Sequence, residues 1–468
     1  MSSPSSKLWG GRFDRPPDEA FNQFQRSFPF DRRLLPYELR VNRAWAQALE
    51  NAGLLSSAET AEILNALAQI ELRVKGEPAW VSASAAEDVH HFVEMALVEL
   101  AGPVGWKVHT GRSRNDLVAT DFRLFVKDAI ADMRDAVARL IRALIEHAEL
   151  HFGVPMPGMT HLQHAQPILY AHFLLAHVEG FFRDVERLAN ARRAADLCPL
   201  GSAALAGTPF PVDRVALARQ LGFAGVTANS LDAVSARDFA LDYLYTIAVI
   251  STHLSRLAED FVLFASSEFG FVTPGDEHST GSSIMPQKRN PDAWELIRGK
   301  TARATSGLFS LLTTLKGLPT GYQRDLQEDK EPLFETHDQS LAAVRVAASA
   351  IATLQVNESR LRQAASDPGL LATEAADFLV RRGLPFRQAH EVVGRVVREA
   401  ERMGQPWTKL PMERLRTFSP LFDEELHRVV TLEAALAARS VAGGTAPENV
   451  RSSIARSRER LSQMEVHT

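Results

Sequence analysis

Residues 117–150 read LVATDFRLFVKDAIADMRDAVARLIRALIEHAEL, and this stretch decides the fold. Its apolar side chains recur at steps of three and four, at Phe122, Val126, Ile130, Met133, Val137, Leu140 and Leu144. That spacing places them in one stripe along a single helix. The predicted helix is much longer than the globular mean of about 11–12 residues, which predicts packing against other long helices in a bundle.

The same period returns in four later stretches of the chain. A second helix is predicted from Pro167 through Ala189, because proline suits the first turn of a helix. Three more are predicted at 239–264, from Pro291 to about residue 315, and from residue 331 to about residue 354. The chain shows neither alternating strands and helices nor a repeat of fixed period. The sequence therefore predicts an all-α fold built around five long helices.

Shorter helical patterns, broken more often by proline and glycine, flank this central region. They predict a three-domain organisation. An N-terminal helical domain would cover residues 1–111, the long-helix bundle residues 112–360, and a C-terminal helical domain residues 361–468.

Composition narrows the class of protein. The formal net charge is −5, and no block of lysine and arginine stands out, which argues against a nucleic-acid partner. The single cysteine, Cys198, excludes an internal disulfide and fits a reducing compartment. No segment reads as a signal peptide, and no apolar run approaches the ~18 residues of a membrane span. We therefore expect a cytoplasmic protein without a membrane partner.

Three polar clusters sit beside the long helices. The first, HTGRSRND at 109–116, directly precedes the first helix, where Ser113 or Asn115 can cap and Asp116 suits the first turn. Helix N-termini bind anions, and two arginines beside one can clamp a carboxylate. A plain cap with solvated arginines is an equally good interpretation of this cluster alone.

The second cluster, MTHLQHAQP at 159–167, precedes the second predicted helix. Imidazole is the commonest acid/base group near neutral pH, so His161 and His164 are candidates for proton transfer. Metal ligation is a minor alternative, because no nearby cysteine or carboxylate completes a site. A single histidine would by default be structural, but the flanking polar side chains favour a polar pocket.

The third cluster, PGDEHSTGSSIMPQKRNP at 274–291, is rich in small residues and ends at the fourth predicted helix. It lacks the spacing of a phosphate-binding P-loop. Ser282 lies in its flexible part, and Lys288 follows six residues later. Glu295 then falls within about the first helical turn. A disordered linker is the alternative, although the charged, proline-containing end is unlike a spacer.

Residues 281–291, GSSIMPQKRNP, resemble the signature of the fumarase/aspartase superfamily, whose pattern is G-S-S-x-M-x-x-K-x-N. The segments GRSRND (111–116) and THLQ (160–163) narrow the resemblance to the argininosuccinate lyase family, which includes the lens protein δ-crystallin. Further similar segments lie at 7–13, 321–330, 372–380 and 383–390, so the resemblance covers nearly the whole chain. It implies reversible anti elimination of argininosuccinate to arginine and fumarate, without metal or organic cofactor.

The chemistry explains the residues that the resemblance assigns to catalysis. Removing a proton beside a carboxylate adds negative charge to an existing one, so oriented positive charge must stabilise the intermediate. Lys288 and Asn290, at the start of a helix, would supply part of this stabilisation. Ser282 would take the carbon proton, with Lys288 and backbone N–H groups holding its alkoxide. His161, oriented by Glu295, would protonate the departing nitrogen, and the reverse assignment of the two roles stays open.

Matching to the family also implies a set of substrate-binding residues. Arg114 and Lys330 would bind carboxylates of the substrate. Tyr322 and Gln327 would bind its amino-acid end. The set is Ser27, Ser113, Arg114, Asn115, Thr160, Asn290, Tyr322, Gln327 and Lys330. The chain departs from the family pattern at Leu117, Met159 and His164, where glutamine, tyrosine and arginine are usual. These differences could alter packing around the site, but they remove none of the assigned residues.

Two other functions remain open at this point. The chain could be another lyase of the superfamily, acting on adenylosuccinate, aspartate or fumarate. It could also be a structural protein on the same scaffold, as some crystallins are, because fold does not guarantee function.

The length of the first helix has a consequence that is independent of the family. A helix over 117–150 is roughly 50 Å long at ~1.5 Å per residue. The arginine cluster lies at its start, and the His161 cluster follows its end. One chain with a straight helix cannot bring both into one pocket. If they share a site, different subunits must supply them, which predicts an antiparallel oligomer and agrees with the homotetramer that the resemblance implies.

Overall fold

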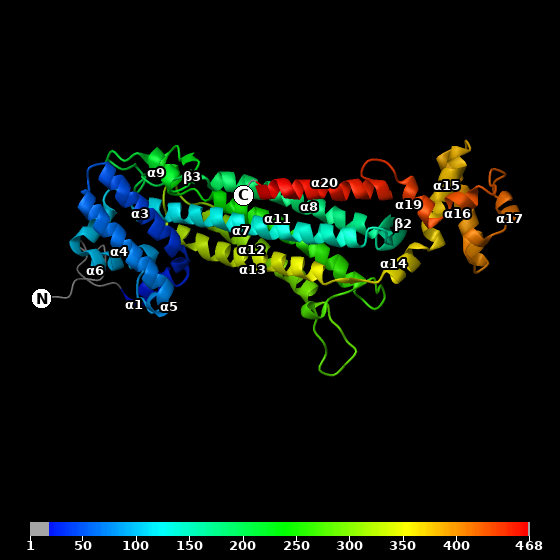
Figure 1. The fold of residues 1–468 in the computed structure, drawn as a ribbon, viewed down its shortest axis with the longest axis horizontal. Helices are drawn as coiled ribbons and strands as arrows, with labels where there is room; N and C mark the ends of the chain where they lie inside the picture. The colour runs from blue at the N-terminus through cyan, green and yellow to red at the C-terminus, as the bar shows by residue number, and fades with distance from the viewer. Residues whose placement is uncertain (1–17, 467–468) are drawn as a thin grey trace. The chain divides into compact units, whose positions relative to one another are not determined.

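A computed structural model describes residues 18–466 of the chain, which are mostly helical (Figure 1). The segment at 7–13 that resembles the family's N-terminus lies outside the described residues. The chain forms two compact units. Unit 1 contains residues up to 134 with 186–249 and 302–340, and unit 2 contains 135–185, 250–301 and 341 onward. The predicted division into three domains stays a prediction.

The five long helices confirm the all-α prediction. They are α7 (Arg114–Leu150), α8 (Tyr170–Ala195), α11 (Asp238–Phe264), α12 (Asp292–Leu315) and α13 (Lys330–Ala352). The apolar stripe of α7 is buried along its whole length, from Phe122 to Leu144. Burial of this stripe is the main stabilising contribution of such a helix, because propensity alone contributes little.

The predicted start of the second helix is wrong. Pro167 lies in a strand, β2 (Gln163–Leu169), which pairs in antiparallel fashion with β1 (Pro155–Thr160), and α8 begins only at Tyr170. The register shifts between Gly158 and Met159. A side chain at position 158 would meet the carbonyl oxygen of Gln166 at 2.8 Å, so only glycine fits there. Ile168 suits either a strand or a helix in this pattern, which is why spacing alone misplaced the boundary.

Unit 1 carries the shorter helices of the N-terminal part of the chain. They are α1 (Glu19–Phe24), α2 (Phe28–Asp31), α3 (Leu35–Asn51), α4 (Ser57–Gly76), α5 (Pro78–Ser82), α6 (Val89–Ala101) and the 3₁₀ segments η1 (Arg32–Leu34) and η2 (Gly102–His109). Ser56 and Glu59 form a capping box at the start of α4. Asp88 caps α6 by accepting a hydrogen bond from the His91 amide. The cap fixes where the carboxylate of Asp88 lies.

Unit 1 also contains several short connecting elements. These are α9 (Arg214–Gln220), α10 (Ser230–Ala233), η4 (Arg324–Asp329) and the parallel pair of strands β3 (Leu197–Cys198) and β4 (Gly225–Val226). Cys198 is fully buried, and burial raises the pKa of its thiol to about 11. The side chain therefore packs as a neutral thiol and does not act as a nucleophile at neutral pH.

Unit 2 carries the hairpin, the long loop before α12, and the C-terminal helices. These helices and 3₁₀ segments are η3 (Asp276–His278), α14 (Glu358–Ala365), η5 (Pro368–Leu371), α15 (Ala372–Arg381), α16 (Phe386–Arg402), η6 (Trp407–Lys409), α17 (Met412–Arg416), α18 (Leu426–Val429), α19 (Leu432–Ala438) and α20 (Pro447–Val466). Strands β5 (Val272–Thr273) and β6 (Gln355–Val356) pair in antiparallel fashion. α15 and α16 lie side by side around a core that includes Phe378 and Trp407 (Figure 1). Among the described helices, none is long and apolar enough to cross a bilayer.

Candidate active site

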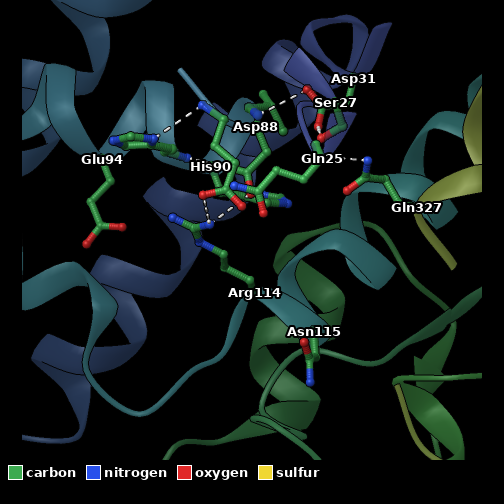
Figure 2. Close-up of polar contacts among 12 residues, drawn as sticks. Gln25, Ser27, Asp31, Asp88, His90, Glu94, Arg114, Asn115 and Gln327 are labelled. Carbon is green, nitrogen blue, oxygen red and sulfur yellow. Dashed lines mark hydrogen bonds and ion pairs between the residues drawn. The ribbon is translucent and has the colours of Figure 1, made fainter. Parts of the chain in front are cut away.

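A cavity of about 130 Å³ in unit 1 is lined by residues from widely separated parts of the sequence. Six of the predicted substrate-binding residues lie around it: Ser27, Arg114, Asn115, Tyr322, Gln327 and Lys330. Asp31, Asp88, His90 and Arg324 complete the polar part of the lining. Figure 2 shows several of these side chains converging from α2, α6, α7 and the segment before α13. A polar cavity with charges of both signs suits a small zwitterionic ligand.

The N-terminus of α7 is built by Ser113 and Asp116. The Asn115 amide donates to Ser113 Oγ at 3.3 Å, and the Ser113 amide donates to Asp116 Oδ1 at 2.9 Å. Ser113 is therefore the cap, whereas Asn115 is helical and its amide side chain donates to the carbonyl of Ala204. Asp116 also accepts from the amides of Gly201 and Ala203, and burial raises its pKa to about 6.

Arg114 is held at the cavity by two carboxylates. Its Nη1 lies 2.9 Å from Asp88 Oδ2 and 3.7 Å from Glu87 Oε2 (Figure 2). Arg324 Nη2 lies 3.1 Å from the other oxygen of Glu87. Both arginines therefore keep N–H donors close to the cavity. A carboxylate ligand would bind them in place of part of this acidic pairing.

Ser27 and Asp31 form a buried pair on α2. Ser27 Oγ donates to Asp31 Oδ2 at 2.6 Å, and the Val89 amide donates to Asp31 Oδ1 at 3.0 Å. Burial raises the pKa of Asp31 to about 6, against the opposing effect of the Ser27 hydrogen bond. The carboxyl of Asp31 thus titrates near neutral pH at the wall of the cavity.

Gln327 lies in η4, directly before α13, and Lys330 is the first residue of α13. Gln327 Nε2 donates to the carbonyl of Gln25 at 3.1 Å. Lys330 is 3 % exposed, and its Nζ lies 2.7 Å from Asp329 Oδ1. The other oxygen of Asp329 lies 2.5 Å from Arg237 Nε. One buried carboxylate between two cations leaves this group of three side chains with a net positive charge.

Within residues 18–466, one group of three histidine and carboxylate side chains comes close enough to hold a metal ion. It consists of Glu38, His90 and Asp121. His90 Nδ1 lies 2.7 Å from Glu38 Oε2. Burial and the charge of Glu38 raise the pKa of Asp121 well above its usual range. Arg112, whose Nη2 donates to Asn42, already supplies a positive charge here. The charges balance without a cation, so this cluster fits a metal poorly.

Thr160 and His161 lie at the tip of the β1–β2 hairpin in unit 2 and are exposed. The turn is His161-Leu162, whose φ angles of 56° and 57° are both left-handed. Neither residue is glycine, so the turn stores strain of the kind that is common at functional sites. The hairpin thus holds His161 outward from a short, defined turn.

Ser282 lies in the loop that connects η3 to α12, which Figure 1 draws as a long excursion. Its Oγ accepts hydrogen bonds from the amides of Ile284 at 3.2 Å and Met285 at 3.0 Å. Two donors on one hydroxyl oxygen favour its anionic form. Lys288 is exposed on the same loop.

The base of this loop is closed by a short bridge. The Asn290 amide donates to the Thr280 carbonyl at 2.8 Å, and Asp292 Oδ2 accepts from Thr280 Oγ1 at 2.6 Å. Asp292 and Glu295 lie in the first turn of α12, as predicted for Glu295. The predicted fourth helix therefore starts one residue after Pro291.

Within unit 2 the predicted catalytic residues are not yet assembled. No hydrogen bond or ion pair joins His161 to Glu295, or Ser282 to Lys288, among the described residues. The orienting role of Glu295 and the alkoxide-holding role of Lys288 therefore stay predictions. The same holds for binding by Thr160 and Asn290.

Comparison with known proteins shows which family the chain resembles. The family profile described as "Lyase" matches residues 11–306, more than half of the chain, and the profile described as "Argininosuccinate lyase C-terminal" matches residues 369–437. The argininosuccinate lyase of Roseiflexus castenholzii is 47 % identical, covering 97 % of this chain and 100 % of that protein. That of Thiobacillus denitrificans is 46 % identical over 98 % and 99 % of the two chains.

The chain belongs to the argininosuccinate lyase family. It is an enzyme of the lyase class, as the resemblance of its polar clusters predicted. Among solved structures, EDDS lyase in complex with formate has a TM-score of 0.85 at 28 % identity, covering 99 % of this chain and 94 % of that chain. The class II fumarase of Schistosoma mansoni has a TM-score of 0.70 at 17 % identity, covering 86 % and 90 %, and supports the fold alone.

Sequence reasoning missed several residues that shape the cavity of this family member. Asp31, Asp88 and Asp329 hold Ser27, Arg114 and Lys330. For Asp88 there was a usable signal, because an aspartate directly before the apolar run VHHFV is typical of a helix cap. No local sequence signal points to Asp329, since its partner Arg237 lies 92 residues away in sequence.

Proposed function

We propose that this protein converts argininosuccinate to arginine and fumarate, reversibly, as a cytoplasmic homotetramer in arginine biosynthesis. The observation that carries the proposal is the gathering of Ser27, Arg114, Asn115, Tyr322, Gln327 and Lys330 around one cavity. Relatives named argininosuccinate lyase, about 47 % identical over nearly the full chain, support the substrate. A structural relative, an EDDS lyase variant, was solved with bound fumarate.

The charges of the cavity match those of the substrate. Argininosuccinate carries three carboxylates, an α-ammonium and a guanidinium. Arg114, Arg324 and Lys330 offer donors to carboxylates. The acidic side chains of Asp31 and Asp88 offer acceptors to the cationic end. The substrate therefore finds partners of both signs, which a plain dicarboxylate such as fumarate would only half use.

Ser282 is the proposed base in the forward reaction. A free serine is far too weak a base, so its alkoxide must be stabilised. The amides of Ile284 and Met285 already donate to its Oγ, and closure of the loop would bring Lys288 to the same oxygen. Ser282 takes the proton from the carbon beside the carboxylate, and the electron pair moves into that carboxylate.

His161 is the proposed acid. Collapse of the doubly charged carboxylate forms the double bond of fumarate and breaks the bond to nitrogen, and His161 protonates the departing guanidino group of arginine. The hairpin tip is exposed, so the imidazole of His161 is accessible to substrate bound on another subunit. Glu295 would orient the imidazole, as the family resemblance implies.

A substrate assay tests the proposal directly. Wild-type protein should release fumarate, followed by its ultraviolet absorbance, from argininosuccinate but not from adenylosuccinate or aspartate. A superfamily lyase of another specificity would reverse that order, and a crystallin-like structural protein would release nothing from any of them.

Two substitutions test the assigned roles. Ser282→Ala and His161→Asn should each lower kcat by at least about 10²-fold, in line with general acid–base contributions of about 10²–10⁴-fold. Ser283→Ala, in the same loop, is the matched control and should stay near wild type. Near-normal turnover in both Ser282→Ala and His161→Asn would show that the assignment of the catalytic residues is wrong.

A further inference from the structure

A second cavity, of about 350 Å³, lies between α15 and α16, within unit 2. None of the residues that line it was assigned above to catalysis or substrate binding. The apolar part of its lining includes Ala376, Val393 and Val397, and charged side chains of both signs lie beside them. An apolar surface with a few polar groups, in a cavity of this size, is typical of a site for a small molecule.

α16 contains a glycine that its own packing does not require. Gly394 lies in the interior of this helix and lines the cavity. A glycine there makes a helix less stable than alanine would, because it loses more backbone freedom on folding. A side chain at position 394 would meet no atom within 4 Å, so no neighbouring group excludes one. The glycine therefore keeps open a space that the chain itself does not use, which indicates a ligand.

Two nitrogen-bearing side chains flank that space. His390 and Arg398 lie four residues before and four residues after Gly394, so all three share one face of α16. Side chains on a helix lean toward its N-terminus, which directs Arg398 over the position of Gly394. Within residues 18–466, no hydrogen bond or ion pair occupies the Arg398 guanidinium. A free guanidinium beside an open space suits a carboxylate, which it can bind through two N–H groups.

Glu401 supplies the opposite charge on the same cavity. It follows Arg398 by three residues, but the described part of the chain shows no ion pair between them. By the same lean of helical side chains, Glu401 reaches back over Val397. Phe386, whose side chain is 54 % exposed, lines the other end of the cavity and offers an aromatic face. The cavity thus offers partners for an anion, a cation and an apolar body in one small volume.

We propose that the groove between α15 and α16 binds a free α-amino acid with an apolar or aromatic side chain. Arg398 and His390 bind its carboxylate above Gly394, and Glu401 binds its ammonium group. The side chain of the ligand packs against the valines of α16 and the ring of Phe386. Arginine fits less well, because the apolar floor offers its guanidinium no acceptor. The site is independent of the proposed function and needs no turnover.

Calorimetric titration of the full, untagged chain with L-phenylalanine tests the proposal. Wild type should bind one molecule per chain. Arg398→Gln and Glu401→Gln should each weaken binding by about 10-fold or more, the usual effect of losing a hydrogen bond to a charged group. Gly394→Leu, which fills the open space, should abolish binding. Arg395→Gln, which removes an exposed arginine of α16 outside the lining, is the matched control and should bind as wild type does.

Two analogues of the probe separate the two charges. L-Phenylalaninamide lacks the carboxylate and 3-phenylpropionate lacks the ammonium group, so wild type should bind each at least about 10-fold more weakly than L-phenylalanine. Arg398→Gln should distinguish L-phenylalanine from its amide much less than wild type does, because the main partner of the carboxylate is gone. Equal discrimination by both proteins would contradict the role given to Arg398.

The remaining outcomes place the ligand. Arg114→Met should bind L-phenylalanine as wild type does, whereas loss of binding in this variant would put the ligand in the cavity of unit 1 and overturn the proposal. Circular dichroism checks that each variant is folded. If Gly394→Leu does not fold, Gly394→Ala decides, because alanine favours the helix and should still weaken binding by occupying part of the space. Failure of wild type to bind L-phenylalanine at millimolar concentration, or unchanged binding in the folded Gly394 variant, also overturns it.

Discussion

At the scale of single residues, the cavity of unit 1 is governed by carboxylates that are buried beside cations. Asp88 holds Arg114, Asp329 holds Lys330, and Asp31 accepts from Ser27. Removing one partner of a buried pair is costly, because the other charge is left without compensation. These acids therefore fix where the ligand-binding side chains lie, at some expense in stability for the acid itself.

For Asp31, the effect of burying the carboxylate on the stability of the fold can be measured as a function of pH. Its pKa is about 6 in the folded chain and 3.8 for the unperturbed group, so the folded state binds its proton more tightly. Between these values stability falls as pH rises, by up to roughly 3 kcal/mol for a shift of this size. Asp31→Asn, which mimics the protonated acid, should therefore match wild type near pH 4 and exceed its thermal midpoint above pH 6.

The measurement compares thermal midpoints of the two proteins across pH 4–7.5. Asp116, whose pKa is also raised to about 6, gives wild type and variant the same background slope. The quantity that matters is the difference between the two curves. A difference in thermal midpoint that does not change with pH would show that Asp31 has the same pKa in the folded and unfolded states.

At the scale of elements, the long helices were predictable and the hairpin was not. α7, α11, α12 and α13 follow from periodicity, because burial of one stripe fixes both helix type and approximate ends. The β1–β2 hairpin has prolines at 155, 157 and 167 and a bulge at Gly158, so its pattern matches neither period. Its pairing depends on contacts between strands, which local spacing does not encode.

The candidate site divides in the same way. Ser113, Arg114 and Asn115 could be predicted because a helix N-terminus has a local signature. The convergence of Ser27, Gln327 and Lys330 on Arg114 could not, because it joins segments about 300 residues apart and no residue pattern records it. Family resemblance supplied those residues where physical reasoning alone did not.

The bridge at the base of the Ser282 loop leads to a prediction at this scale. Thr280 donates through both its amide and its hydroxyl to Asp292 Oδ2. Asp292→Ala removes the oxygen that accepts both hydrogen bonds, so the loop should lose its fixed ends. Turnover should then fall by about 10-fold or more, since small misplacement of a reacting group is costly. Protease cleavage within 281–289 should become faster.

Glu259→Ala is the matched control for that change. It removes an exposed carboxylate on α11 that pairs with Arg298, a residue of α12 like Asp292, and exposed pairs contribute little. Its turnover and cleavage rate should stay at wild-type values. Equal cleavage of Asp292→Ala and wild type would mean that Asp292 does not hold the loop.

At the scale of the whole molecule, the length of α7 sets the argument for assembly. The helix runs unbroken over 37 residues, which corresponds to about 55 Å. Arg114 begins it, whereas Thr160 and His161 follow its end. A site that uses both groups is therefore best completed by a second copy of the chain, and symmetric oligomers provide such sites in equivalent copies.

Subunit mixing tests this shared site. Arg114→Met and Ser282→Ala should each be inactive alone, but hybrids formed after dissociation and reassembly should regain activity. If a site takes Arg114 from one subunit and Ser282 from another, random mixing at equal amounts leaves about one quarter of the sites intact. Mixing Ser282→Ala with Lys288→Met, whose positions lie in the same loop, should restore nothing, because every site then draws one defective loop. Exchange is verified by mass-tagged subunits. Exchange without recovery of fumarate release would contradict a site that is shared between subunits.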